Sequence, residues 1–348
     1  MTLYVYNQAF ELIGVLDAYE SLIWTTRYYS EGDFELYIPA KHEYFDILVQ
    51  NNYIVRETQL DNAMIIERIR IETNLETGNY LLVSGRCLKS LLNRRIIWEQ
   101  TTLSGRIEMC IRKLVTENAI SPTITARKIP SLILGALNSF TETMNNQYSG
   151  DELLYTITTI CKNVGYGFDI KFDADNKKFI FEIYKGTDRS FSQTANPYVV
   201  FSPDYDNLIS SDYVTSQMDL KNVARIGGEG EGSARRYAIS GSASGLARRE
   251  LFVDARDISS DNGAIKDTEY NSLLVDRGNE KLAACVATQA FSGETDTEHA
   301  YKLNRDFFLG DIVQVQNEYG ISAAPRIVEI IESTDENGVK TIPTFSDF

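Results

Sequence analysis

The chain has 348 residues, of which 43% are hydrophobic and 24% are charged. This is the composition of an ordinary globular protein, and the length predicts two or three domains. The 34 Lys and Arg residues against 49 Asp and Glu residues give a formal charge of −15. Such a charge argues against a general nucleic-acid binder, because phosphates need a basic surface. With only two histidines, His-rich metal sites and most His-based acid–base chemistry are excluded.

No stretch of the sequence approaches the roughly 20 apolar residues that a membrane-spanning helix needs. The N-terminus also lacks the basic start and apolar core of a secretory signal. We therefore expect no membrane-spanning segment and synthesis in a cytoplasm. In that reducing compartment the widely spaced cysteines should be buried free thiols, and they are Cys87, Cys110, Cys161 and Cys285.

The N-terminal part of the chain has the pattern of short β-strands. Leu3–Tyr6 and Leu12–Leu16 are apolar runs, and Phe34–Ile38 alternates between apolar and polar residues. Ile65–Ile71 and Tyr80–Val83 flank a turn sequence, which predicts a hairpin. Several short strands separated by turns favour a barrel or a sandwich.

Two helices are predicted next. Ser104 is a candidate N-cap for an apolar stripe over residues 107–115. Ser149 and Glu152 have the spacing of a capping box, and Gly165 supplies the stop signal of that second helix.

The following segments alternate in type. Phe168–Phe172 and Phe179–Ile183 predict a hairpin, which with the preceding helix forms a compact α+β unit. Gly227–Leu246 is rich in Gly, Ser and Ala and is expected to be a long exposed loop. Asp267–Gln289 predicts one helix, and Asp335–Gly338 predicts a turn between two final strands.

The sequence contains no recognisable catalytic motif. It lacks a Gly-x-Ser-x-Gly elbow and a His-Glu-x-x-His helix, so we predict no catalytic, cofactor-binding or metal residue. Gly227–Gly232 is no phosphate loop, because its two glutamates would repel phosphate. Counting alone leaves a two-carboxylate glycosidase open among 49 acidic residues.

Three further features have two interpretations each. The stretch Arg225–Arg256 holds six arginines against four acidic residues, and it is either a mobile loop or a loop that orders against a partner subunit. The aromatic residues within Trp24–Tyr37 are either core or subunit interface. Gly32-Asp33 and Gly310-Asp311 both precede alternating segments, through common turn chemistry or through duplication of a β-domain.

The segment Tyr19–Pro39 resembles the start of the siphovirus tail-hub and tail-tip protein family, which is similar in architecture to the baseplate hub of contractile phages. Further stretches that resemble this family are Ser84–Leu92, Cys161–Phe168, Leu309–Val315, Arg326–Ile330 and Asn337–Phe345. The resemblance implies an α+β, mainly β fold with two tube-type β-barrel domains. These would be residues 1–97 and 199–348, the latter with the loop 227–246 and the helix 267–289, around an α+β domain at 98–198.

The resemblance also implies a function and partners. A homotrimer of such chains would close the distal tail tube of a siphophage virion, with pseudo-sixfold symmetry suited to hexameric tail rings. Its expected partners are the distal tail protein, a fibre or receptor-binding protein, and the tape-measure protein as a further candidate. DNA would only pass through its channel, which we expect to be lined by acidic side chains. Some members of the family continue into a lytic region, whereas this sequence ends after the last barrel-like strands, so we expect a non-enzymatic protein without cofactors. The alternatives are a tail-associated cell-wall hydrolase and a glycan-binding adhesin module.

Overall fold

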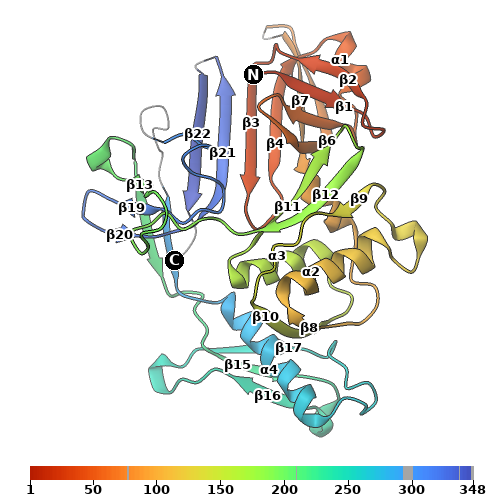
Figure 1. Cartoon of the computed structure of the whole chain (residues 1–348), viewed down its shortest axis with the longest axis vertical. Helices are drawn as coiled ribbons and strands as arrows, with labels where there is room; N and C mark the ends of the chain where they lie inside the picture. The colour runs from red at the N-terminus through yellow and green to blue at the C-terminus, as the bar shows by residue number, and fades with distance from the viewer. Residues whose placement is uncertain (77, 209, 293–300, 337, 346–348) are drawn as a thin grey trace.

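The computed structural model describes residues 1–76, 78–208, 210–292, 301–336 and 338–345. The largest sheet of the protein is antiparallel and combines strands from both ends of the chain (Figure 1). Its strands are β1 Leu3–Tyr6, β2 Leu12–Leu16, β3 Ser21–Arg27, β4 Asp33–Pro39, β5 Tyr53–Arg56, β6 Gln59–Asn74, β7 Gly78–Cys87, β14 Asp212–Ser216, β18 Thr288–Ser292, β21 Ile327–Asp335 and β22 Gly338–Phe345. The order is β14-β18-β22-β21-β3-β4-β7-β6-β5-β1-β2, so the β3–β21 pairing joins the two ends of the chain in one sheet.

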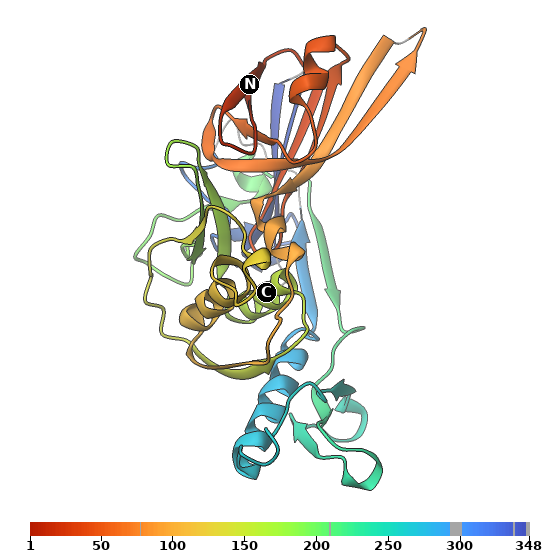
Figure 2. The ribbon, with the colours of Figure 1, turned by 90° about the vertical axis from the view of Figure 1, so that its right-hand side faces the viewer.

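The N-terminal half of the sheet curls around an apolar core. Alternation along β4 buries Phe34, Leu36 and Ile38 against Trp24 of β3, as the sequence pattern predicts. Helix α1 (His42–Ile47) contributes Tyr44 to the same core. The predicted hairpin is confirmed, with β6 and β7 paired from Met64↔Cys87 to Asn74↔Gly78. Its distal end extends past the other strands (Figure 2).

The middle of the chain forms the predicted α+β unit. Its elements are β8 Thr101–Arg106, α2 Ile107–Val115, β9 Leu132–Leu134, β10 Thr143–Tyr148, α3 Leu153–Val164, β11 Gly167–Asp173 and β12 Lys178–Tyr184, with short helical turns at Leu88–Arg94, Thr116–Ile120 and Thr125–Arg127. The hairpin is confirmed, with Phe168 opposite Ile183 and Phe172 opposite Phe179. These side chains and the apolar stripes of α2 and α3 form the largest core of the molecule, which reaches the outside of the curl at Tyr53.

Both predicted N-caps are wrong, whereas the predicted stop of α3 is confirmed. Ser104 is held in β8 by pairing with Asn145, so α2 begins only after Arg106. The chain turns before α3, and there Glu152 itself is the N-cap, accepting a hydrogen bond from the backbone N–H of Tyr155 at 3.3 Å. Gly165 ends α3 in the left-handed conformation at φ 70°.

The C-terminal part has a separate core beside the large sheet. A small sheet of β13 Val200–Phe201, β19 Gln314–Gln316 and β20 Ser322–Ala323 packs against β18, β21 and β22. Phe201, Phe291 and Phe345 meet at its centre. The predicted final hairpin is confirmed by the pairing of β21 with β22, although Asn337 lies outside the described residues.

Residues 217–287 form an inserted module between β14 and β18. Those two strands pair down to Ser216↔Thr288, so the module stands at the end of a two-stranded stem. It contains β15 Val223–Gly227, β16 Tyr237–Ser240, β17 Glu250–Asp254 and α4 Asp267–Ala283, with short helical turns at Pro203–Tyr205 before it and at Gly232–Ala234 and Gly245–Ala247 within it. The inner sheet face and α4 enclose their own apolar core.

Two predictions for this module differ from the structure, one in the type of element and one in the end of a helix. The expected loop 227–246 contains β16, which pairs with β15 from Ala224↔Ser240 to Gly227↔Tyr237. The expected helix 267–289 is confirmed from Asp267 to Ala283, and only its predicted end is wrong, because the chain must return to pair with β14 from Thr288 onward. Sequence pattern misses both because tertiary pairing overrides local propensity.

The mainly β character of the fold is confirmed, but no closed barrel is found among the described residues, where the large sheet ends at β2 and β14. The domain boundaries at 97 and 198 remain a prediction. All four cysteines are free thiols, as predicted. Cys87, Cys110 and Cys161 are also buried, whereas Cys285 is half-buried. No helix in the described part of the chain is long and apolar enough to span a bilayer.

Candidate functional site

A buried ion pair crosses the interior of the curl. Arg56 of β5 is 2% exposed, and its Nη1 lies 2.5 Å from Glu332 Oε2 on β21. Its guanidinium carbon lies 4.7 Å from the ring centroid of Trp24. In the sheet order β5 and β21 are separated by four other strands. The side chains of this pair therefore connect two strands that are not neighbours in the hydrogen-bonded sheet.

Tyr28, directly after β3, lies where the N-terminal, middle and C-terminal parts of the chain meet. Its hydroxyl donates to the carbonyl of Gly165 and accepts from the N–H of Gly186, both at 3.1 Å. Its ring packs on Gly167 and Gly310, where a Cβ would lie 2.3 Å and 2.2 Å from ring carbons. Burial raises the pKa of the Tyr28 hydroxyl to about 12, so it stays a neutral donor.

Asp311 fixes the C-terminal side of this junction. Its carboxylate is 2% exposed and accepts from Arg189 Nε at 2.7 Å, from the N–H of Thr187 at 2.7 Å and from the N–H of Phe308 at 3.0 Å. Asp33, by contrast, pairs with Arg27 and is 45% exposed. The two Gly-Asp pairs therefore have different surroundings, and a duplication remains a prediction.

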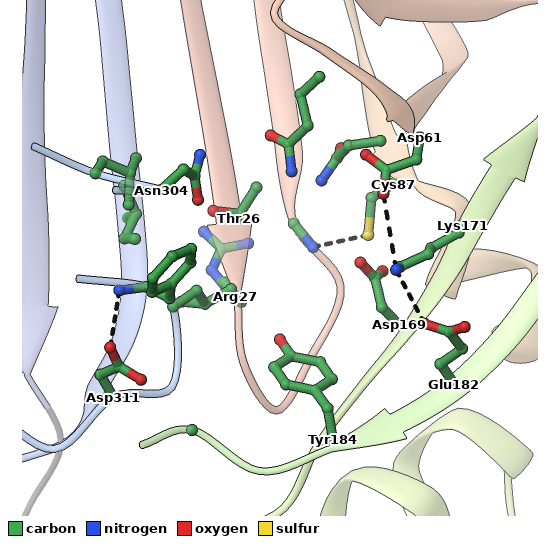
Figure 3. A pocket seen from close by; sticks show the side chains of 18 of the residues that line it. Thr26, Arg27, Asp61, Cys87, Asp169, Lys171, Glu182, Tyr184, Asn304 and Asp311 are labelled. Carbon is green, nitrogen blue, oxygen red and sulfur yellow. Dashed lines mark hydrogen bonds and ion pairs between the residues drawn. The ribbon is translucent and has the colours of Figure 1, made fainter. Parts of the chain in front are cut away.

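A cleft of about 590 Å³ opens between the curl, the β11–β12 hairpin and the segment 303–311 (Figure 3). Its walls carry charges of both signs. They are formed by Thr26, Arg27, Gly32, Gln59, Asp61, Asn62, Cys87, Lys89, Asp169, Lys171, Glu182, Tyr184, Lys185, Gly186, Thr187, Arg189, Leu303, Asn304, Phe308, Leu309, Asp311, Ile330 and Glu332.

The charged groups of the cleft are largely satisfied by one another. Lys171 Nζ lies 3.1 Å from Glu182 and 3.8 Å from Asp61 (Figure 3). Lys89 Nζ donates to the backbone carbonyls of Arg27, the last residue of β3, at 2.5 Å and of Ser30 at 3.1 Å. Burial raises the pKa of the Asp169 carboxyl, and the positive charge of Lys89 opposes that rise.

The cleft offers no activated nucleophile. Burial raises the pKa of the Cys87 thiol, whose sulfur accepts a hydrogen bond from the N–H of Gly32 at 3.1 Å. Reactive cysteines have a lowered pKa, so this raised pKa does not favour a nucleophilic role for Cys87. In the described ranges no group of three or more His, Cys, Asp and Glu side chains could hold a metal ion. Of the two histidines, His42 begins α1 and His299 lies outside the described residues.

The face of the large sheet opposite its apolar cores, here called the open face, carries several ion pairs. Arg27 Nε lies 2.6 Å from Glu329 and its Nη1 2.5 Å from Asp33. Arg86 likewise lies between Glu67, at 2.7 Å, and Glu31, at 3.6 Å. Each guanidinium is thus matched by two carboxylates.

The aromatic residues of the segment 24–37 divide between core and surface. Trp24, Tyr28 and Phe34 are buried, which confirms their interpretation as core. Tyr37 instead stacks on Tyr80 of β7 on the open face, with ring centroids 4.5 Å apart. The sequence could not locate the cleft or the Arg56–Glu332 pair, because both combine residues more than 200 positions apart.

A sequence model of one protein family, described as Siphovirus ReqiPepy6 Gp37-like protein, matches residues 2–346. A search of curated protein sequences finds no match. The fold is shared with solved phage tail proteins over nearly the full length of each chain. A tail protein from Neisseria meningitidis MC58 matches with a TM-score of 0.59 at 13% identity, covering 99% of this chain and 96% of that one.

Two prophage tail proteins are similar to the same degree. The 43 kDa tail protein of prophage MuSo2 from Shewanella oneidensis has a TM-score of 0.55 at 11% identity, covering 100% of this chain and 98% of that one. Tail protein gp18 from Listeria monocytogenes EGD-e has the same TM-score and identity, with 100% and 95% covered. These likenesses show a common fold, and the family match extends over almost every residue. The chain therefore belongs to the Siphovirus ReqiPepy6 Gp37-like family of siphovirus tail proteins.

Proposed function

We propose that this chain is the structural hub at the distal end of a siphophage tail. In this role three copies close the tail tube, join the distal tail protein and carry the fibre or receptor-binding apparatus, with the tape-measure protein as a further partner. The observation that carries the proposal is the family match over residues 2–346 together with a fold common to phage tail proteins.

The organisation of the large sheet is compatible with ring assembly. Among the described residues of one copy the sheet ends at β2 and β14, and we propose that a neighbouring copy covers these edges. Within the trimer we propose that the N-terminal and C-terminal parts, 1–97 and 199–348, act as the two tube-type barrel units of each chain. Three chains with two such units give the sixfold pattern that a hexameric tail ring requires.

We place the channel lining on the open face. There, Arg27 and Arg86 are each flanked by two carboxylates, so their positive charges are neutralised. Glu35 of β4 adds an exposed carboxylate to this face. A polyanion passing such a surface meets few free cations to which it could bind, which suits DNA transit without retention.

The role we propose is non-enzymatic. The cleft holds mutually paired charges and a protonated thiol, and its geometry resembles a junction between parts of the chain more than a reaction centre. Zymography on cell-wall material tests this directly: a cleared band at the position of the purified chain would favour a tail-associated hydrolase instead. Tight binding of glycans by a free monomer would favour the adhesin alternative.

Electron microscopy of the purified chain, alone and with the distal tail protein, tests the hub itself. We expect a ring of three copies with a central hole. A monomer in both preparations would contradict the proposal.

A further inference from the structure

The inserted module exposes the outer face of its three-stranded sheet. The inner face, with Ala224 and Ile226, is covered by α4. On the opposite side the register brings Arg225 of the central strand β15 between Ile239 of β16 and Phe252 of β17. Tyr237 completes the cluster opposite Gly227. We call these four residues, Arg225, Tyr237, Ile239 and Phe252, the outer face.

Three large apolar side chains are exposed here side by side. Ile239 is 63% exposed, Phe252 55% and Tyr237 44%. Adjacent exposed apolar groups of this kind mark interaction surfaces, whereas scattered single ones need no explanation. Tyr and Arg at the centre of a patch are also the residues that most often dominate binding energies.

Arg225 differs from the other arginines of the segment 225–256. Those at 235, 236, 248, 249 and 256 donate hydrogen bonds to carboxylates or carbonyl oxygens. Arg225 instead lies with its guanidinium carbon 4.3 Å from the ring centroid of Tyr237, and within the described part of the chain it has no carboxylate partner. Arg235 also lies over the Tyr237 ring, at 5.8 Å, but it is paired with Asp254. Among the described arginines of this segment, Arg225 is therefore the one whose guanidinium is left to form a bidentate pair with an incoming carboxylate.

The charge distribution of the chain identifies the partner that fits. Residues 217–287 hold ten Lys and Arg against eleven Asp and Glu, so the module is nearly neutral. The remaining residues hold 24 Lys and Arg against 38 Asp and Glu. The body of a second copy therefore presents the carboxylate excess that Arg225 lacks within its own copy.

We propose that the outer face packs against the acidic body of a second copy of this chain, with Arg225 pairing to a carboxylate there. The inference rests on the proposed homo-oligomeric hub and deepens it by naming one contact of the ring. Four side chains are fewer than the roughly 20 residues a side of a stable interface, so this contact is one part of a larger one.

Sedimentation velocity on the full chain provides the first test. Wild type should form oligomers. Arg225→Glu should raise their dissociation constant by at least about 30-fold, because a negative charge would then face the carboxylates of the second copy. Lys266→Glu is the matched control: it makes the same charge change at the exposed N-cap of α4, on the other side of the sheet, and should assemble as wild type does. Circular dichroism checks that both variants are folded.

Cross-linking locates the contact. Arg225→Lys keeps the charge and offers an amine that a carbodiimide joins to a touching carboxylate. In a mixture of heavy-isotope-labelled and unlabelled copies, we expect mixed-isotope cross-links from position 225 to an Asp or Glu of another copy. Cross-links confined to one copy would overturn the inference.

The remaining outcomes separate this inference from the hub proposal. If wild type assembles and Arg225→Glu assembles equally well, the inference fails while the hub stands. If wild type stays monomeric up to about 100 µM, the contact between copies is refuted, and microscopy with the distal tail protein decides the hub separately. Binding of duplex DNA that Arg225→Glu abolishes would overturn the inference in favour of a polyanion as occupant.

Discussion

Removing the charge of Glu332 should destabilise the protein strongly, because it would leave Arg56 without a counter-ion inside the curl. Arg56 is 2% exposed, and its remaining contacts would be Gln59 Oε1 at 2.8 Å and the face of Trp24. Breaking a buried ion pair in this way costs about 3–5 kcal/mol. We therefore expect Glu332→Gln, which keeps the size of the side chain, to lower the free energy of unfolding by about 3 kcal/mol.

A double variant separates the lost pair from lost packing. Arg56 Nε is buried without a hydrogen-bond partner, which adds to the cost of keeping a guanidinium there. Replacing both residues by apolar ones, Arg56→Met with Glu332→Leu, should therefore restore most of the stability of wild type. If the double variant is as stable as wild type, the ion pair selects the curled arrangement of the sheet more than it stabilises the chain.

Urea unfolding followed by tryptophan fluorescence measures these changes, since Trp24 lies beside the pair. The control is Glu72→Gln, which breaks the exposed Arg70–Glu72 pair and should cost no more than about 1 kcal/mol. If Glu332→Gln costs as little as this control, Arg56 is hydrated and the ion pair does not hold the curl together.

Three further predictions concern single positions. Gly278→Ala should destabilise the protein by about 1–3 kcal/mol in urea unfolding, because the new Cβ would lie 2.6 Å from Ile226 Cδ1. Helix propensity alone would instead give a gain of roughly 1 kcal/mol. A measured gain would show that α4 can move away from the sheet. Gly310→Ala should cost about 3 kcal/mol or more, since φ is +96° and the Cβ would meet the Tyr28 ring, and unchanged stability would contradict the close packing of that junction. Asp169→Asn should be more stable than wild type at pH 7: burial raises the folded-state pKa of this carboxyl, so wild-type stability falls as the pH rises from the unfolded-state pKa to the folded-state pKa. Urea unfolding measured across pH tests this. If the difference in free energy of unfolding between variant and wild type does not grow with pH, the prediction is contradicted.

Local patterns in the sequence predict the local elements well. Alternation in Phe168–Phe172 and Phe179–Ile183 identifies the observed hairpin, and the apolar stripe with Gly165 identifies α3. These elements are set by side-chain periodicity and by a terminal glycine, both of which can be read in the sequence.

Features that depend on distant parts of the chain could not be predicted. The β3–β21 pairing, the Arg56–Glu332 pair and the cleft join residues from opposite ends of the sequence. Strand β16 was predicted as loop because its Gly- and Ser-rich surroundings have low strand propensity, which pairing with β15 and packing under α4 override. The short motifs resemble siphovirus tail proteins, and the family match over residues 2–346 confirms that family.

Cryo-electron microscopy of intact tails that contain this chain would show whether it forms the structural hub of a siphophage tail. We predict three copies in a ring around a central channel at the distal end of the tail tube, with the open face of the large sheet toward the channel. Density for this chain elsewhere in the tail, or as single copies attached outside the tube, would contradict its role as the hub.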